Sequence, residues 1–134
     1  MSIVLGGYVL DENAQRHQIP VTLDPDDSVI EEALLSVKQA SGAIGLRYQP
    51  EPESGPYELM LYSENGNFLL MLNEHEEDGD TNVRTINQAD IDNELISILG
   101  ECYPAKAITH DFQTICLAFK EFSDSGDVSG QLLR

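Results

Sequence analysis

The sequence predicts an α+β domain, with a mainly antiparallel sheet of about five to six strands packed against about three helices. The sheet is expected to be built around a hairpin over residues 57–74, where two apolar runs are joined by Asn65-Gly66. Apolar residues also recur at helical spacing in three segments, which predicts helices at about 25–41, 88–99 and 110–122. With 134 residues, the chain is expected to form a single domain over 1–134.

The Asn65-Gly66 turn determines which residues pair across the predicted hairpin. A type I′ turn needs positive φ at both central positions, which Asn and Gly adopt readily. The resulting pairs are Glu64 with Asn67, Ser63 with Phe68, Leu61 with Leu70, and Leu59 with Leu72. Both faces of the hairpin are then apolar at their centres, so both need a cover or a partner. We expect the three helices to cover both faces and to make the hairpin the centre of the core.

Other strands are predicted from short apolar segments that are bounded by turn residues. They span residues 3–10, 19–23, 43–48 and 83–86. The polar segment 11–18 between the first two is expected to be a turn. Near the end of the chain, residues 128–133 fit either a last edge strand or a dangling tail.

The first predicted helix has recognisable signals at both ends. Asp24 is the expected N-cap, and Pro25 suits the first helical position. Asp26 and Asp27 then place negative charge near the positive end of the helix dipole. Gly42 is expected to end the helix, because glycine favours the left-handed conformation found at helix stops.

The second and third helices have weaker boundaries. Asn87 is the expected N-cap of the second helix, and Gly100 is its expected stop. Thr109 is the candidate N-cap of the third helix, which carries a stripe of apolar and aromatic residues. Within it, residues 114–119 are short and apolar enough to fit a strand as well.

The charge balance excludes several classes of partner. The chain holds 24 Asp and Glu against 7 Lys and Arg, a net charge of −17. Because phosphate recognition depends on Lys and Arg, we expect no direct binding to nucleic acid or to an anionic membrane. The charge fits either a solvated surface that aids solubility or a basic protein partner attracted by complementary charge. The N-terminus lacks a secretory signal and no stretch resembles a membrane span, so a cytoplasmic location is expected.

The sequence carries no motif for catalysis or for a cofactor. The Gly6-Gly7 pair lies outside any phosphate-binding glycine pattern. The three histidines, His17, His75 and His110, fall in separate segments without the spacing of a metal site or a nucleophile partner. We therefore expect no enzymatic activity, no catalytic residue and no cofactor.

Neither the acidic residues nor the cysteines predict a metal site. Three residues of the acidic region copy the first ligands of an EF-hand loop, at Asp78, Asp80 and Asn82. The sixth position of that loop holds Val83 in place of Gly, and the twelfth holds Ala89 in place of a bidentate Glu. Cys102 and Cys116 show no ligand spacing. They are expected to be reduced thiols with at least one buried, and a disulfide is the less favoured alternative.

Two segments resemble parts of the small acidic immunity proteins of bacterial polymorphic-toxin and contact-dependent growth inhibition systems. Residues 54–72, SGPYELMLYSENGNFLLML, are similar to their central paired strands. Residues 118–129, AFKEFSDSGDVS, are similar to a late helix that runs into a Phe-x-x-Phe motif and a Ser/Thr-Gly turn. The chain has no Trp for a tryptophan-bearing final strand, so no subfamily is assigned. The resemblance implies a non-enzymatic cytosolic protein that binds one cognate toxin domain, often a nuclease, and blocks its active site or substrate surface.

A basic toxin domain would be expected to contact acidic residues, with tyrosines as aromatic anchors. The candidate partner-binding residues are Glu74, Glu76, Glu77, Asp78 and Asp80 in the acidic run, Glu51 and Glu53 in the preceding loop, Asp26 and Asp27 at the first helix, and Tyr57 and Tyr62 in the hairpin. Two alternatives remain open: a secretion chaperone that holds an effector's unfolded segment, and a regulatory or structural subunit. A homodimer formed through an exposed hairpin face is also possible.

Overall fold

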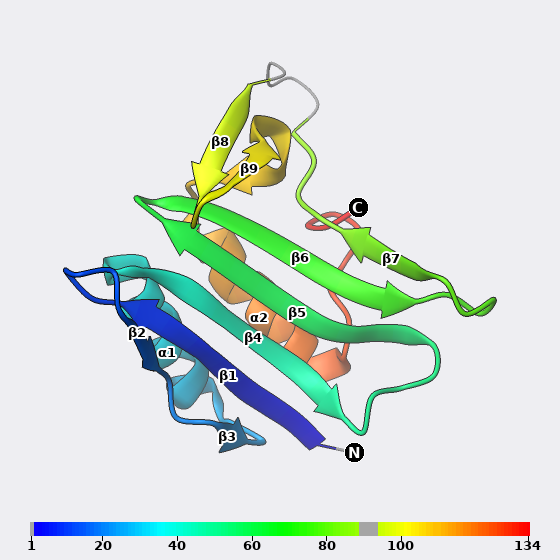
Figure 1. The fold of residues 1–134 in the computed structure, drawn as a ribbon. Helices are drawn as coiled ribbons and strands as arrows, with labels where there is room; N and C mark the ends of the chain where they lie inside the picture. The colour runs from blue at the N-terminus through cyan, green and yellow to red at the C-terminus, as the bar shows by residue number, and fades with distance from the viewer. Residues whose placement is uncertain (1, 89–93) are drawn as a thin grey trace.

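The computed structural model describes residues 2–88 and 94–134, and it shows an antiparallel sheet with helices packed on one face (Figure 1). The main path of the sheet runs β10-β6-β5-β4-β1-β2, with β3 beside β1 and β7 beside β6. These eight strands are β1 (Ser2–Leu10), β2 (Arg16–Gln18), β3 (Thr22–Leu23), β4 (Ser41–Gln49), β5 (Gly55–Glu64), β6 (Asn67–His75), β7 (Thr81–Arg84) and β10 (Ile108–Thr109). The α+β class is confirmed, although the described residues form more strands than expected.

The central hairpin has the predicted register. Strands β5 and β6 pair with Glu64 opposite Asn67, and the pairing continues through Leu59 and Leu72. The turn residues Asn65 and Gly66 have φ values of 53° and 79°, as a type I′ turn requires. Since side chains alternate between faces along a strand, this turn decides which residues of both strands face the helices.

Helix α1 (Asp27–Gln39) begins later than predicted. Its N-cap is Asp26, whose carboxylate accepts a hydrogen bond from the backbone N–H of Val29. Asp24 is not the cap, because its carboxylate instead accepts a hydrogen bond from the backbone N–H of Ile3 in β1.

Gly42 does not end α1, which stops at a C-cap on Ala40. Gly42 lies inside β4, where a Cβ atom would stand 2.2 Å from the backbone oxygen of Tyr8 in the neighbouring strand. A close approach between two strands therefore requires this glycine, and the sequence signal was misassigned to the helix.

The last helix is confirmed as α2 (Phe112–Ser125), so the strand alternative for residues 114–119 is wrong. Its N-cap is Asp111 rather than Thr109, because the Asp111 carboxylate accepts a hydrogen bond from the backbone N–H of Gln113. Neither α1, with 13 residues, nor α2, with 14, has the length and apolarity of a membrane-spanning helix, and no other described segment provides one.

The predicted helix at 88–99 is wrong where the structure describes it. Residues 89–93 lie outside the described residues, and the segment that follows forms strand β8 (Leu95–Ile98), paired with β9 (Glu101–Pro104). The turn between them is Leu99-Gly100, with φ values of 54° and 88°. Gly100 therefore serves a hairpin turn and not a helix stop. Leu rarely adopts positive φ, so Leu99-Gly100 carries no recognisable hairpin signal.

The two helices cover only one face of the sheet, so the expectation that helices cover both faces is wrong. Side chains of Leu59, Leu61, Leu70 and Leu72 point to α1 and α2 and are fully buried. The other face carries a smaller buried cluster under the β8–β9 hairpin, formed by Leu69, Ile98, Ala107 and Ile108. Residues Ala105–Ala107 form a short 3-10 helix before β10. Among the described residues, no helix lies over the remaining part of this second face (Figure 1).

Several boundary predictions also change. The segment 11–18 is not wholly a turn, because Arg16–Gln18 pairs with β1 as strand β2. The strand predicted at 19–23 shrinks to Thr22–Leu23, whereas the one at 83–86 is observed as β7, shifted to Thr81–Arg84. Residues 128–133 are neither an edge strand nor a dangling tail, since Val128 and Leu133 are buried in the main core.

The adjacent glycines of β1 provide a test of the strand packing. A Cβ at Gly7 would stand 2.2 Å from the backbone oxygen of Ala43, and Gly7 has a φ of 153°. A Cβ at Gly6 would meet nothing within 4 Å. We expect Gly7→Ala to lower the free energy of unfolding by roughly 1–3 kcal/mol. Gly6→Ala should leave it unchanged or raise it by up to about 1 kcal/mol. Urea unfolding of both variants measures the difference, and equal effects would contradict this packing.

Candidate functional site

The face of the sheet opposite α1 and α2 is called the open face here. The pairing of β1, β4, β5 and β6 places three cross-strand rows on it. The rows are Tyr8, Ala43, Tyr62 and Leu69; Gly6, Gly45, Met60 and Met71; and Val4, Arg47, Glu58 and Asn73. The β8–β9 hairpin covers one end of this face, at Leu69, whereas no helix within residues 2–88 and 94–134 covers the middle or the opposite end (Figure 1).

Three tyrosines gather at the covered end of the open face. Tyr8 comes from β1, Tyr62 from β5 and Tyr103 from β9, and their phenol groups are close enough to influence one another electrostatically. Burial raises the pKa of Tyr62, with smaller contributions from Glu58 and the other two tyrosines. Burial also raises the pKa of Tyr103, followed by Glu101 and Tyr8. All three rings are half-buried, so each still presents surface to a partner.

A guanidinium group already packs on this tyrosine cluster. The Cζ atom of Arg16, in β2, lies 4.3 Å from the ring centre of Tyr8. Cations bind to aromatic faces because the ring carries negative charge density there. The contact shows that the Tyr8 ring can accept a cation on its face.

The middle of the open face is hollowed because two paired positions have no side chain. Gly6 and Gly45 are direct partners across β1 and β4. The space beside them has a volume of about 280 Å³ and is lined by Val4, Gly6, Gly7, Gln18, Val21, Gly45, Arg47, Glu58 and Met60. We call this space the glycine hollow. Its floor is backbone at the glycines. Its walls combine the apolar side chains of Val4, Val21 and Met60 with the polar side chains of Gln18, Arg47 and Glu58.

The turn between β6 and β7, residues 76–80, is called the acidic loop. The carboxylates of Glu76, Asp78 and Asp80 are exposed, and one oxygen of each lies within 4.8 Å of the others. Among the described residues, this is the group of carboxylates close enough together to share a metal ion. None of the ion pairs between described residues involves these three acids. Their charge is therefore available to a partner.

Glu74 differs from the rest of the predicted acidic run because it is part of the fold. It lies in β6, and its carboxylate accepts hydrogen bonds from the side chains of Asn82 (2.8 Å) and Arg84 (3.4 Å). Arg84 also donates to Asp127 (3.1 Å) and to the backbone oxygen of Val128. Arg84 thereby connects β7 to the segment after α2, and Glu74 stabilises this contact by binding the Arg84 side chain.

Two further predicted residues meet near the end of β6. The ring of Tyr57 stacks on His75, with ring centres 4.2 Å apart and planes inclined by 13°. His75 Nε2 lies 3.2 Å from a carboxylate oxygen of Glu51. The structure thus brings Glu51 and Tyr57 to the same corner as the start of the acidic loop. Glu53 lies exposed in the same loop as Glu51.

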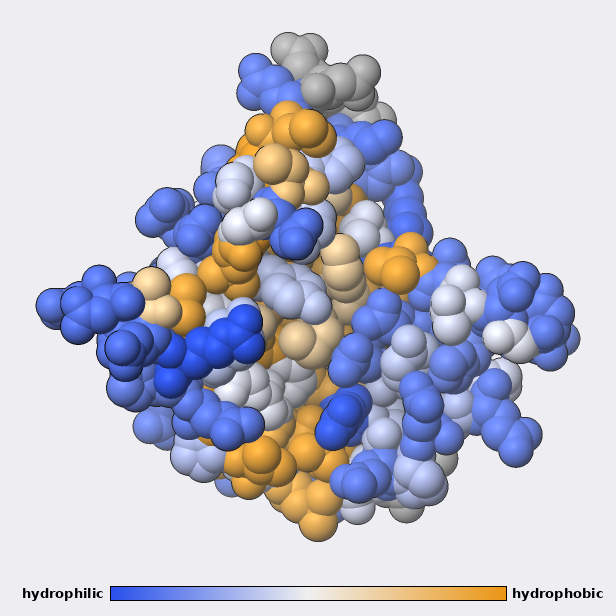
Figure 2. Space-filling model, in the orientation of Figure 1, coloured by the Kyte–Doolittle hydropathy of each residue, from blue (hydrophilic) through white to orange (hydrophobic). Residues whose placement is uncertain are grey.

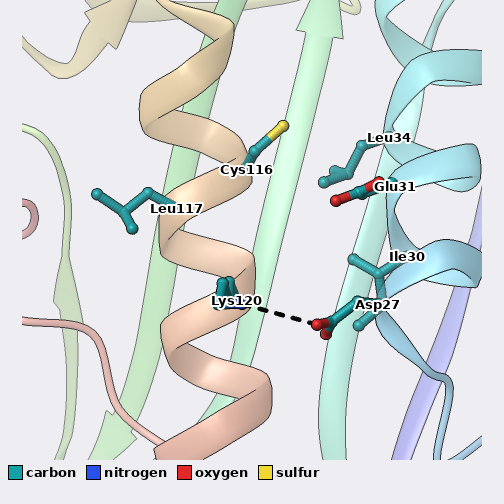
Figure 3. Close-up of a pocket in the computed structure, with 7 residues that line it drawn as sticks. All are labelled: Asp27, Ile30, Glu31, Leu34, Cys116, Leu117 and Lys120. Carbon is teal, nitrogen blue, oxygen red and sulfur yellow. Dashed lines mark ion pairs between the residues drawn. The ribbon is translucent and has the colours of Figure 1, made fainter.

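Asp26 and Asp27 lie on the helix side of the sheet, away from Tyr62. Asp26 caps α1, and hydrogen bonds from Ser28 and the backbone of Val29 lower its pKa. Asp27 pairs with Lys120 of α2 at 3.7 Å, beside a groove of about 230 Å³ between the helices (Figure 3). The predicted partner-binding residues therefore do not form one surface.

The cysteines are free thiols in different places. Cys102 is exposed on β9, and Cys116 is half-buried on α2, so the expected free thiols are observed but the expected burial is found only in part, at Cys116. The Cys116 side chain points between the helices toward Leu34 and Glu31 (Figure 3). Burial, with a smaller contribution from Glu31, raises its pKa and keeps the thiol protonated.

Of the aromatic and methionine residues on the open face, Tyr62 was predicted from the sequence as a partner-binding residue. Tyr8, Met60, Met71 and Tyr103 were not. The available signal was alternation in the strands: residues two apart share a face, and one face of the hairpin holds methionine and tyrosine where the other holds leucine. Tyr103 had no such signal, because no strand was predicted around it.

Comparison with known proteins places the chain in a family. Residues 2–132 match the model of a Family of unknown function (DUF6911). The chain belongs to this family. A crystal structure of a hypothetical protein from Neisseria gonorrhoeae is similar, with a TM-score of 0.86 and 29% sequence identity over 96% of this chain and 90% of that chain. None of the curated proteins compared with the chain matches it.

Arg84 provides a test of the corner beside the acidic loop. We expect Arg84→Met to lower the free energy of unfolding by roughly 1–3 kcal/mol, because it leaves the half-buried Glu74 without its cation and frees the Val128 segment. Arg47→Met is the matched control, since Arg47 is exposed and takes part in no ion pair between described residues. Its effect should stay within about 0.5 kcal/mol. Chemical unfolding of both variants measures the two changes in free energy. An Arg84→Met variant as stable as the wild type would refute the structural role of Arg84.

Proposed function

We propose that this protein is a non-enzymatic immunity protein that binds a cognate basic toxin domain, such as a nuclease, in the cytoplasm and neutralises it. The observation that carries this proposal is the acidic loop. The loop holds Glu76, Asp78 and Asp80 together in solvent, and none of them joins an ion pair between described residues. Holding like charges together costs free energy unless a cation approaches them, so the loop favours a basic partner.

The charge of the whole chain supports the same class of partner. A net charge of −17 creates a field that attracts a basic domain and speeds its association. Proteins that act on nucleic acid present Lys and Arg to the phosphates, so their clefts complement such an inhibitor. An inhibitor that occupies this cleft blocks the substrate without any chemistry of its own.

The environments of the histidines support a non-enzymatic protein. His17 contacts Asp11 at 2.7 Å, in the region of the β1–β2 turn. His75 lies against Tyr57 and Glu51, and His110 contacts Asn67 at 2.8 Å, before α2. Each histidine thus has a different partner in a different part of the fold. These contacts are typical of surface and structural roles rather than of a general base beside a nucleophile.

Neutralising the acidic loop tests the proposal. We expect the combined variant Glu76→Gln, Glu77→Gln, Asp78→Asn and Asp80→Asn to associate roughly tenfold more slowly with the toxin domain encoded beside this gene. Its rate should also depend less on salt than the wild-type rate does. Stopped-flow or surface-based kinetics over a series of salt concentrations measures both quantities.

A control variant removes the same number of charges elsewhere. Neutralising the exposed acids Glu12, Glu31, Glu32 and Asp124 changes the net charge equally but leaves the acidic loop intact. A clearly smaller effect is expected from this control, because the lost charges lie farther from the contact. Equal slowing by both variants would mean that only total charge matters. If the wild-type protein neither binds the toxin domain nor protects cells that express it, the proposed function is wrong.

A further inference from the structure

The side chains of the open face are less buried than those on the helix side of the same strands. Along β5, Leu59 and Leu61 are fully buried, whereas Met60 and Tyr62, which alternate with them, are only half-buried. Met71 of β6 is half-buried in the same way. Figure 2 shows apolar side chains on this face at the β8–β9 hairpin and at the end near β3, with residues of mostly intermediate hydropathy between them and hydrophilic regions on both sides. Exposed apolar side chains that gather on one face of a charged protein are typical of an interaction site.

The composition of the open face is that of an interface centre. It carries three of the chain's five tyrosines, Tyr8, Tyr62 and Tyr103, together with Met60 and Met71. Its cations are Arg16 and Arg47. Tyr, Met and Arg are enriched at the centres of protein interfaces, where Lys, Asp and Glu are depleted. This chain is rich in Asp and Glu, so a face dominated by tyrosine, methionine and arginine differs from the rest of its surface.

The glycine hollow gives this face a shape that a flat sheet lacks. A Cβ at Gly6 would meet nothing within 4 Å, so the space above it is open. At its paired position, a Cβ at Gly45 would stand 2.2 Å from the sulfur of Met60, so this methionine packs over Gly45 and forms one wall. Val21, 68% exposed, lines another side. The resulting volume of about 280 Å³ is sufficient for one large apolar side chain of a partner.

The charges favour a basic protein over a second copy of this chain as the occupant. Two copies would bring net charges of −17 together, which opposes association. On the face itself, Glu58 lies beside the glycine hollow, and Glu101 is near Tyr103. A partner's Lys or Arg at these positions would gain an ion pair and an aromatic contact, as Arg16 already does on Tyr8. Arg16 and Arg47 would meet carbonyl or acidic groups of the partner.

We propose that the open face is the surface on which the basic toxin domain docks, with one apolar side chain of that domain in the glycine hollow. This inference rests on the proposed function and adds a contact surface that the acidic loop alone does not provide. The acidic loop lies at the β6–β7 end of the same sheet (Figure 1), so it attracts and orients the partner. The tyrosines and the hollow then determine how long the complex lasts.

A pair of matched variants tests the surface. Val21→Lys adds one positive charge at an exposed apolar position on the rim of the glycine hollow. Leu35→Lys adds the same charge at an exposed apolar position of α1, on the other side of the sheet, where Leu35 is 45% exposed. Gly6→Val fills the hollow from below at a site with room for a Cβ. Binding of the purified toxin domain encoded beside this gene is measured by calorimetry at one salt concentration, and melting temperatures verify folding.

We expect Val21→Lys and Gly6→Val to raise the dissociation constant roughly tenfold or more, mainly through faster dissociation. Leu35→Lys should leave it within about twofold of wild type. If the wild-type protein binds but both open-face variants stay within that range, the inference is overturned and the proposed function stands. If Gly6→Val does not fold, the Val21 and Leu35 pair decides alone.

The remaining outcomes also test the inference. If the wild-type protein does not bind the toxin domain, the proposed function fails and this inference fails with it. If gel filtration shows a wild-type dimer that Val21→Lys dissociates, a second copy occupies the open face and the inference is overturned. Poly-lysine serves as a probe of charge alone. Poly-lysine should bind wild type, Val21→Lys and Leu35→Lys with similar affinity. A loss of poly-lysine binding by Val21→Lys alone would mean that the open face recognises charge rather than a folded domain, and it would overturn the inference.

Discussion

The pairing of β5 with β6 is the constraint on which the rest of the structure depends. A two-residue turn with positive φ at Asn65 and Gly66 allows one register, and a slip by one residue would exchange the two faces of both strands. In the observed register, leucines from both strands point to α2, where Phe119 and Phe122 are fully buried against the same core. The main core of the protein therefore forms on the helix side of the sheet.

The one-sided core explains why the second face has a different composition. Met60, Tyr62 and Met71 alternate with the buried leucines, and no helix lies over them in the described residues. The β8–β9 hairpin covers only the end near Leu69. At the middle of the face, the paired glycines Gly6 and Gly45 remove side chains where a covering element would need contacts. The sheet is thus stabilised mainly through its helix side, and its other side is the surface that we propose for binding.

The acidic residues divide into those that the fold uses and those that remain in solvent. Glu74 is bound by Arg84, Asp26 caps α1, and Asp27 pairs with Lys120. Glu76, Asp78 and Asp80 take part in no ion pair between described residues and lie together at the end of the hairpin. Charge at this place is far better positioned to act on a partner than charge already paired within the fold. The proposed division of roles, with attraction by the acidic loop and contact by the open face, follows from this separation.

Local signals in the sequence determined the hairpin register, helices near α1 and α2, and the excess of negative charge, because each depends on residues close together in the chain. The same signals misplaced Gly42 and Gly100, since a glycine required by a neighbouring strand or by a hairpin turn looks the same as one that ends a helix. Only the tertiary structure decided that both helices share one face and that Tyr8, Tyr62 and Tyr103 lie near enough to influence one another electrostatically. Those contacts join strands far apart in the chain, so no local pattern encodes them. The fold thereby separates residues that the sequence had grouped as one binding site, with Asp26 and Asp27 on the helix side and Tyr62 on the open face.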